Sequence, residues 1–327
     1  MLGGTFFIIF AIWWGFALAV KYFHLRHPAK KPSKYHSSTT FSCFCCPTAY
    51  LQRIPLESYL KLLCVSIGIL GEAVTGLKHP YDEVLQKYRW SFIEVNAQHI
   101  TMFFSFGFAS FFEILVHSKQ YDLPAGIEYV TNILAYAIEG FLFKFHLHGR
   151  DEIDIHVHTL LVYSISMCVL ASIWEYCRPN QILATYTRIA ATFLQGTWFY
   201  EAGFILYPPT DSPSWKWTAT HGQILIITVT FVWQFLLILV FLLLQTTIVW
   251  CVLKRRYKNS LNYNYQHLNN EDEVNMNSNN NNHVLKSLMS VNNNGKTVVD
   301  IGSIVQESGD DNESQLEFEQ YRTVPQS

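Results

Sequence analysis

The chain has 327 residues, of which 50% are hydrophobic and only 15% are charged, and its formal net charge is −2. Soluble domains carry about a quarter charged residues, so this composition excludes an ordinary soluble domain and indicates a membrane protein. The near-neutral charge argues against electrostatic nucleic-acid binding, and the sequence contains no zinc-finger, P-loop or Rossmann motif.

Seven apolar stretches are long enough to cross a hydrocarbon core of about 30 Å, which takes roughly 20 helical residues. They extend over residues 4–23, 54–77, 93–117, 124–146, 152–175, 182–206 and 220–252. The first stretch lacks a basic segment before it and is followed by a basic loop, so we interpret it as a retained span and not as a cleaved signal peptide. The sequence therefore predicts an all-α fold, a seven-transmembrane-helix bundle over residues 1–255.

Basic residues are concentrated on one side of this predicted bundle. Six lie in or beside the first loop, and three follow the last span: Lys21, Arg26, Lys30, Lys31, Lys34, Arg53, Lys254, Arg255 and Arg256. The positive-inside rule then predicts an N-terminus outside or in the lumen and a cytosolic C-terminus. Span length is compatible with the endoplasmic reticulum, the endosome or the plasma membrane.

Three of the seven cysteines, Cys43, Cys45 and Cys46, lie in "CFCC" within this first loop. Because cytosolic thiols stay reduced, no disulfide framework is expected. Two interpretations of "CFCC" stay open, a palmitoylation site and a loop with unmodified thiols.

Residues 256–327 differ in composition from the apolar part. They are Asn-rich in "NMNSNNNNH" and then acidic in "ESGDDNESQLEFE", without a sustained apolar period. This pattern predicts a disordered cytosolic tail. "YRTV" at 321–324 has the form of a tyrosine-based sorting signal, which makes the tail a candidate binding site for trafficking proteins.

The stretch "HLHGRDEIDIHVH", residues 146–158, contains four histidines, three acids and an arginine between two predicted spans. In the predicted topology it lies at the outer leaflet. Ionisable groups at this depth are costly and usually face the bundle interior, and His with carboxylate is a ligand set of zinc. We therefore predict a metal site, with zinc as the candidate ion and six candidate ligands: His99, His146, His148, Asp154, His158 and His221. The alternative is that these groups only form hydrogen bonds between helices.

Buried acids add two further expectations. Glu139 shares a helix face with His146 and is the candidate general base of a metal-dependent reaction. Helix-end solvation, or pairing with Arg178 and Arg188, accounts for Glu113, Glu128 and Glu175. If these three instead face inward together with Glu72 and Glu139, they form a charged path across the bilayer, which suits a transporter.

Several segments resemble the transmembrane protein 45 family of seven-span proteins: "GTFFIIFAIWW", "HITMFFSFGF" from His99, "EGFLFKFHLHGRDEIDIHVH" from Glu139, "LQGTWFYEAGFILYPP" from Leu194 and "HGQIL" from His221. The resemblance covers about residues 1–255. It implies the fold and a membrane location and little about activity. Positions matching the candidate site residues carry the same residue types in the family, whereas His156 and Glu201 depart from its pattern, which puts these two in doubt as ligands.

Three functional hypotheses follow. The first is a zinc-dependent membrane hydrolase acting on a lipid or amide, in which bound zinc lowers the pKa of water towards about 7. The second is a transporter or sensor of a metal ion or proton. The third is a non-enzymatic scaffold or trafficking protein. All three have the lipid bilayer as a partner, and the first also has a lipid substrate.

Overall fold

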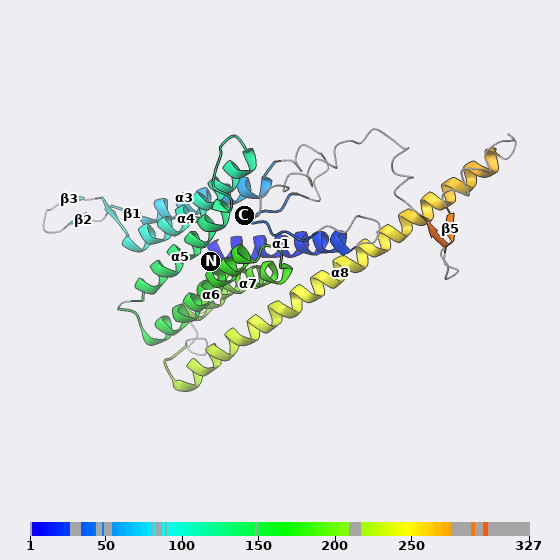
Figure 1. Cartoon of the computed structure of the whole chain (residues 1–327). Coiled ribbons are helices and arrows are strands. Elements are labelled where there is room, and N and C mark those ends of the chain that lie inside the picture. The colour runs from blue at the N-terminus through cyan, green and yellow to red at the C-terminus, as the bar shows by residue number, and fades with distance from the viewer. Residues whose placement is uncertain are drawn as a thin grey trace. The chain divides into compact units, whose positions relative to one another are not determined.

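The computed structural model describes residues 2–26, 34–43, 48, 54–79, 81–82, 87–88, 90–147, 149–208, 217–275, 289–291 and 297–299. Seven helices dominate these residues, and each coincides with one predicted apolar stretch: α1 (Leu2–Arg26), α3 (Leu56–Gly76), α4 (Glu94–Ser118), α5 (Ile127–Phe145), α6 (Glu152–Cys177), α7 (Ile182–Leu206) and α8 (His221–Asn275). Figure 1 shows them in chain order from blue to orange. The all-helical expectation is therefore confirmed.

Five of these helices, α1, α3, α4, α6 and the first forty residues of α8, are long and apolar enough to cross a membrane. The protein is therefore a multi-pass integral membrane protein. Helices α5 and α7 are more polar, because α5 carries Glu128 and Glu139 and α7 carries Arg188 and Gln195. More than half of the residues of α7 are buried in the bundle. Polar residues of this helix can therefore face other helices and stay away from lipid.

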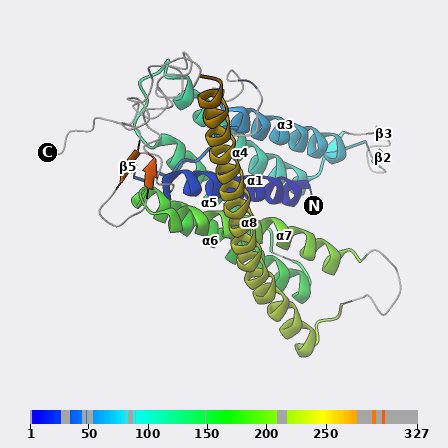
Figure 2. The same cartoon turned by 90° about the vertical axis from the view of Figure 1, so that its right-hand side faces the viewer.

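Six helices form an incomplete ring. Each packs on its neighbour in the order α3, α4, α5, α6, α7 and α1, and α1 touches α3 only slightly (Figure 1, Figure 2). The C-termini of α3 and α5 and the N-termini of α4 and α6 lie at one end of the ring, which we call the histidine end. We call the opposite end the lysine end. The ring therefore has one loose joint, between α1 and α3.

The tightest contact in the ring joins α1 to α7 through two glycines. A Cβ atom on Gly196 would lie 2.9 Å from the backbone nitrogen of Ile8 and 3.0 Å from the carbonyl oxygen of Gly4. A Cβ atom on Gly4 would lie 2.8 Å from the carbonyl oxygen of Gly196. The two backbones approach this closely only because neither residue has a side chain, as in other small-residue contacts between membrane helices.

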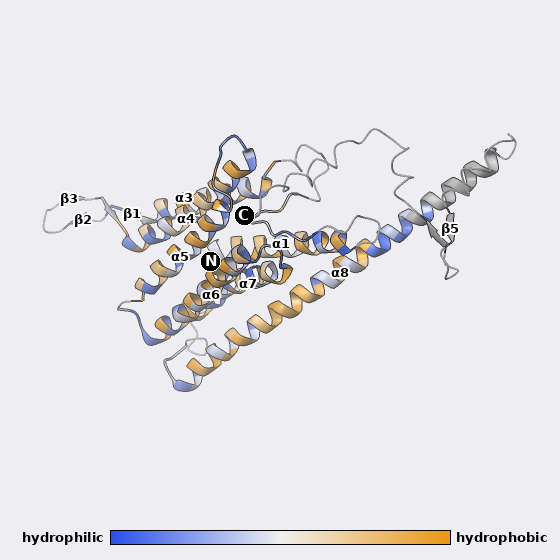
Figure 3. Cartoon of the chain, viewed as in Figure 1, coloured by the Kyte–Doolittle hydropathy of each residue, from blue (hydrophilic) through white to orange (hydrophobic). Residues whose placement is uncertain are grey.

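Helix α8 packs against the outside of this ring through its apolar part. Ile238 and Leu242 are buried in a cluster with α1 and α7, and the Gln245 amide donates to the carbonyl oxygen of Ile12 at 3.0 Å. The Thr246 and Tyr186 hydroxyls lie 2.8 Å apart. Most other residues of this part of α8 are exposed and hydrophobic (Figure 3), as expected for a helix that faces lipid.

Two of the connections between helices lie at the histidine end, one between α5 and α6 and one between α3 and α4. Gly149, in the turn between α5 and α6, has a φ of 75°, a value that L side chains rarely adopt. Helices α3 and α4 are joined by two antiparallel two-residue ladders, which the sequence analysis did not predict. They pair β1 (Leu77–Lys78) with β4 (Ser91–Phe92), and β2 (Tyr81–Asp82) with β3 (Lys87–Tyr88).

The chain divides into two compact units, one of Met1–Arg26 with Ser33–Lys254 and one of His27–Pro32 with Arg255–Ser327. The predicted boundary after residue 255 stays a prediction, and α8 continues beyond it to Asn275. The second unit contains a hairpin of β5 (Met289–Val291) and β6 (Thr297–Val299). The rest of the predicted disordered tail, with "YRTV", lies outside the described residues.

Cys43 is disulfide-bonded, whereas we expected a reduced thiol at this position. Cys45 and Cys46 lie outside the described residues.

Candidate functional site

Four of the six predicted ligands come together at the histidine end of the bundle. The His146 ring centroid lies 6.1 Å from that of His99 and 5.8 Å from that of His158. Asp154, one helical turn before His158 on α6, places its Oδ1 atom 2.6 Å from His158 Nδ1. Four residues, from helices α4 and α6 and from the turn after α5, thus form one cluster, which we call the histidine cluster.

Each of these imidazoles directs its Nδ1 atom at an oxygen. His99 Nδ1 lies 3.2 Å from Glu72 Oε1, and His146 Nδ1 lies 2.7 Å from Gln98 Oε1. His158 Nδ1 lies 2.9 Å from the carbonyl oxygen of Asp154. When these rings are neutral, the oxygen acceptors favour the tautomer with a proton on Nδ1, which leaves the lone pair of each ring on Nε2.

Arg150 occupies part of this cluster. Its guanidinium donates to His146 Nε2 and, at 2.6 Å, to Asp154 Oδ2. The cation therefore uses the lone pair of His146 and neutralises the nearest carboxylate. Within the part of the chain that the structure describes, no group of three or more His, Cys, Asp or Glu residues is arranged to hold a metal ion.

The remaining histidines fall outside the cluster. His221 is the first residue of α8 and is exposed. Within the described part of the chain, His221 makes no contact with His99, His146 or His158. His148 lies outside the described residues. The His156 Nε2 atom lies 2.9 Å from the Thr228 hydroxyl of α8, so His156 faces a different helix.

A cavity of about 180 Å³ lies inside the ring, between α1, α3, α4 and α5. Along α3 the cavity extends from Lys61 to Glu72, and these two residues are separated by roughly 16 Å along the helix axis. Its walls are rich in aromatic residues, among them Phe6, Phe7, Phe10, Phe103, Phe106 and Phe199. His99 and Glu72 line it at the histidine end, so the cavity reaches the histidine cluster.

Glu139 lines this cavity from α5 and is almost completely buried, with 3% of its surface exposed. Its Oε2 atom accepts a hydrogen bond from Gln195 Nε2 at 2.7 Å, while Gln195 Oε1 lies 3.2 Å from the Cys168 sulfur. The thiol thus orients the amide so that its NH2 group faces the carboxylate. Among the described residues, Glu139 Oε1 has no hydrogen-bond partner, so one buried carboxylate oxygen is left for whatever occupies the cavity.

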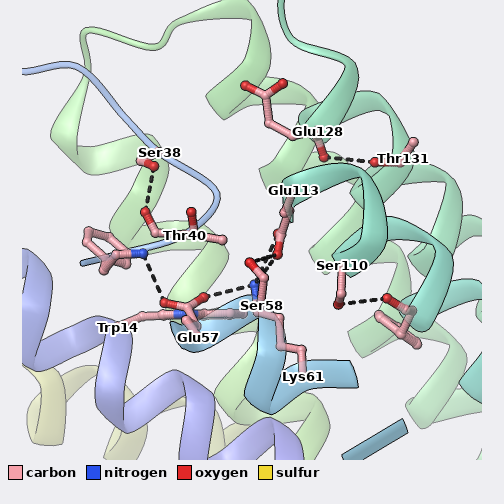
Figure 4. Close-up of polar contacts among 12 residues, drawn as sticks. Trp14, Ser38, Thr40, Glu57, Ser58, Lys61, Ser110, Glu113, Glu128 and Thr131 are labelled. Atoms are coloured by element: carbon pink, nitrogen blue, oxygen red, sulfur yellow. Dashed lines mark hydrogen bonds and ion pairs between the residues drawn. The ribbon is translucent and has the colours of Figure 1, made fainter. Parts of the chain in front are cut away.

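The lysine end of the cavity is closed by an ion network, drawn in Figure 4. Lys61 Nζ lies 2.8 Å from Glu57 Oε1 and 3.0 Å from Glu113 Oε1, and Ser58 donates to Glu113 at 2.9 Å. Glu57 also accepts from the Trp14 indole at 2.7 Å and from the backbone amide of Phe41 at 2.9 Å. Glu57 is therefore surrounded by hydrogen-bond donors from α1, from α3 and from the segment at Phe41.

A second buried ion pair lies beside this network. Arg188 of α7 pairs with Glu175 of α6, which also accepts from Thr185 at 2.6 Å. Arg188 also donates to the backbone carbonyl oxygen of Ser38 at 3.4 Å. The two charges compensate each other, and Arg188 helps to hold the loop over residues 34–41 against the lysine end.

The inner carboxylates thus divide between the two explanations that the sequence analysis left open. Pairing with Arg188 accounts for Glu175, as expected. Of the three acids in the alternative arrangement, Glu113 lines the cavity together with Glu72 and Glu139, whereas Glu128 and Glu175 are not among its lining residues. Sequence reasoning missed Lys61, Glu57 and Gln195, although an intramembrane lysine between two acids is a signal that could have been followed.

Residues 125–247, from the start of α5 into α8, match the model of a family described as "Family of unknown function (DUF716)". The chain is 25% identical over 146 residues to transmembrane epididymal protein 1 of Homo sapiens, covering 45% of this chain and 53% of that protein. The protein of the same name in Rattus norvegicus is 24% identical over 140 residues, covering 42% and 45%. The chain spans about half the length of the curated relatives that it matches.

These similarities support the multi-pass membrane location. Neither carries the name of the transmembrane protein 45 family, so that resemblance stays a prediction. The family description and the names of the relatives indicate no reaction and no metal.

Proposed function

We propose that this protein binds a small apolar or amphipathic molecule inside its helix bundle, taken up from the bilayer. The observation that carries the proposal is the cavity with the free oxygen of Glu139 on its wall. A volume of about 180 Å³ is ample for a ring compound, since an apolar cavity of about 150 Å³ accepts benzene. Aromatic walls with a few polar groups are typical of small-molecule sites.

The loose joint between α1 and α3 supplies the entry route. Leu2 and Gly3 of α1 and Cys64 and Val65 of α3 line the cavity on either side of this joint. The other face of α3 exposes Leu63, Leu70 and other apolar residues of the kind that face lipid. A ligand dissolved in the bilayer therefore reaches the cavity without crossing water.

This function is proposed for a bundle in which all seven helices cross the membrane. The position of α5 and α7 in the ring supports their role as membrane spans. Each of them packs between two ring neighbours, α5 between α4 and α6, and α7 between α6 and α1. The carboxylates at three levels of the cavity also suit the transport hypothesis, for which ligand binding is the first step.

A substitution that fills the cavity tests the proposal. Ala109 lines the cavity and is 4% exposed, whereas Leu134 of α5 is 47% exposed. In nanodiscs, neopentylbenzene should raise the thermal midpoint of the wild type, because a ligand at 100 times its Kd stabilises by about 2.7 kcal/mol. Ala109→Phe should abolish this shift, and the control Leu134→Phe should preserve it. A wild-type protein that no apolar compound stabilises would refute the proposal.

A zinc site at the histidine cluster is a second candidate, and a hydrolase is the activity that it would serve. The observation in its favour is that His99, His146 and His158 each direct Nδ1 at an oxygen, the arrangement that orients histidines for binding a metal through Nε2. Binding requires Arg150 to release His146 and Asp154. His148 and His221 stay predicted ligands, and Glu139 stays the predicted general base of this candidate.

Zinc content decides this second candidate. Elemental mass spectrometry of purified wild type should give about one zinc per chain if the cluster is a metal site, and a triple variant of His99→Ala, Asp154→Ala and His158→Ala should have none. Arg150→Gln removes the competing cation and should raise the affinity for zinc. Zinc below stoichiometry in both wild type and Arg150→Gln would leave the cluster as a set of hydrogen bonds between helices.

A further inference from the structure

The ionisable groups of the cavity are unequally paired. Three carboxylates line it, Glu72, Glu113 and Glu139, together with one lysine and one histidine. Glu72 has His99 as its partner, and Glu113 has Lys61. Glu139 has only the neutral amide of Gln195. Of these three carboxylates, Glu139 is therefore the one without a partner that can carry a positive charge.

Lys61 cannot supply that charge. Its ammonium group is held between Glu57 and Glu113 at 2.8 Å and 3.0 Å, so these three residues already have two negative charges and one positive charge. Arg188 is paired with Glu175 and does not line the cavity. An ionised Glu139 needs a compensating cation, because an unpaired charge in a low-dielectric interior is very unfavourable.

Glu139 shares the cavity wall with a cluster of three aromatic rings, those of Phe7, Phe106 and Tyr136. Tyr136 precedes Glu139 by three residues and so lies on the same face of α5. The ring centroid of Phe106 lies 5.3 Å from those of both Tyr136 and Phe7, and all three rings line the cavity. Aromatic faces attract organic cations, and cages of such rings bind quaternary ammonium groups.

The same bundle already places cations on an aromatic ring. Lys61 Nζ lies 5.2 Å and the Arg188 guanidinium 4.7 Å from the centroid of Trp14, which also lines the cavity. An anionic amphiphile would meet three carboxylates and a lysine that is already paired. A neutral ligand would leave the free oxygen of Glu139 without a partner.

We propose that the ligand of this cavity is a lipophilic cation, an apolar molecule with one ammonium group, whose charge lies against Glu139 Oε1 within the rings of Phe7, Phe106 and Tyr136. This inference rests on the proposed function and specifies its ligand class. Glu139 is then the counter-ion of the ligand, and Gln195 is a positioning residue that orients the carboxylate.

Three probes of similar shape and different charge test this inference. Benzyltrimethylammonium and neopentylbenzene differ only in a charged nitrogen in place of a carbon, and 3-phenylpropionate is an anion of comparable size. Binding to the full-length protein in nanodiscs is measured by thermal shift and by displacement of radiolabelled benzyltrimethylammonium. The wild type should bind the cation at least tenfold more tightly than the neutral probe and should not bind the anion.

Matched variants locate the charge. Glu139→Gln keeps the shape and an oxygen for Gln195, so we expect it to fold, to lose the tenfold preference and to retain the neutral probe. Glu128→Gln, on the same helix but not on the cavity wall, should behave as the wild type. Phe106→Leu should weaken binding of the cation more than binding of the neutral probe, because it removes a ring and keeps an apolar wall.

The outcomes separate the two proposals. Equal binding of the cation and the neutral probe, or an unchanged preference in Glu139→Gln, overturns the cation inference and leaves the proposed function intact. Tighter binding of the anion also overturns the inference. Failure of the wild type to bind either the cation or the neutral probe refutes both.

Discussion

At the residue scale, the bundle contains buried charges of two kinds. Glu175 with Arg188, and Glu57 with Lys61 and Glu113, are enclosed with partners of opposite charge. Such groups cost desolvation energy, which the partner and the added hydrogen bonds offset. A carboxylate oxygen that has no hydrogen-bond partner among the described residues and lies on a cavity wall, such as Glu139 Oε1, indicates a binding role more strongly than a paired group does.

Arg188 provides a test of this distinction. Arg188→Met leaves Glu175 buried without its cation, and removal of one partner of a buried pair costs about 3–5 kcal/mol. We expect a large loss of thermal stability or of folded yield, and partial recovery in the double variant Arg188→Met with Glu175→Leu. Arg178→Met, at an exposed position, is the control and should cost little. A single variant as stable as the control would show that the pair contributes nothing.

The candidate site was partly predictable at this scale. The sequence places His99, His146, Asp154 and His158 at one level because helix length and topology determine depth. It does not show that Arg150 folds back onto His146 and Asp154, because a turn residue can point either way. That one contact changes the cluster from a free ligand set to an ion pair with hydrogen bonds.

At the element scale, close approach of α1 and α7 depends on two glycines. Gly196→Ala should destabilise the protein by about 1–3 kcal/mol, because the added Cβ atom meets the backbone of α1 at Ile8 and at Gly4, which cannot rotate away. Gly71→Ala is the matched control, a glycine inside α3 with nothing within 4 Å of its Cβ position. Thermal unfolding in detergent measures both. Equal stability of the two variants would contradict the packing argument.

Helix limits were predicted well except at the end of α8, which extends to Asn275, and the environment of each helix was predicted less well. Apolar runs bounded by polar residues locate all seven helices, because this signal is local in the sequence. The same runs do not show that α7 is largely enclosed while α3 and α8 expose most of their surface. That difference depends on which helices become neighbours, and the ladders between α3 and α4 are likewise too short to leave a pattern.

At the scale of the whole molecule, the prediction that all seven helices cross the membrane requires the two ends of α5 to lie on opposite sides of it. Lys119→Cys, in the connection before α5, and Glu152→Cys, at the start of α6, are both exposed positions. In a background without other reactive cysteines, a membrane-impermeant maleimide should label Glu152→Cys and Lys119→Cys from different sides. Both sites should react after the membrane is permeabilised. Labelling of both from one side would show that α5 does not cross.

The amino-acid sequence alone determines that this is a multi-pass helical membrane protein, where its helices lie, and that histidines and acids gather at one end. Hydropathy and helical rise suffice for those conclusions, because both are properties of residues near one another in the chain. Only the tertiary structure decides that Arg150 occupies the histidine cluster, that α1 and α3 barely touch, and that Glu139 faces an aromatic cavity. These depend on how each helix is rotated about its axis and on which distant helix it meets, and side-chain packing across the whole bundle selects that arrangement.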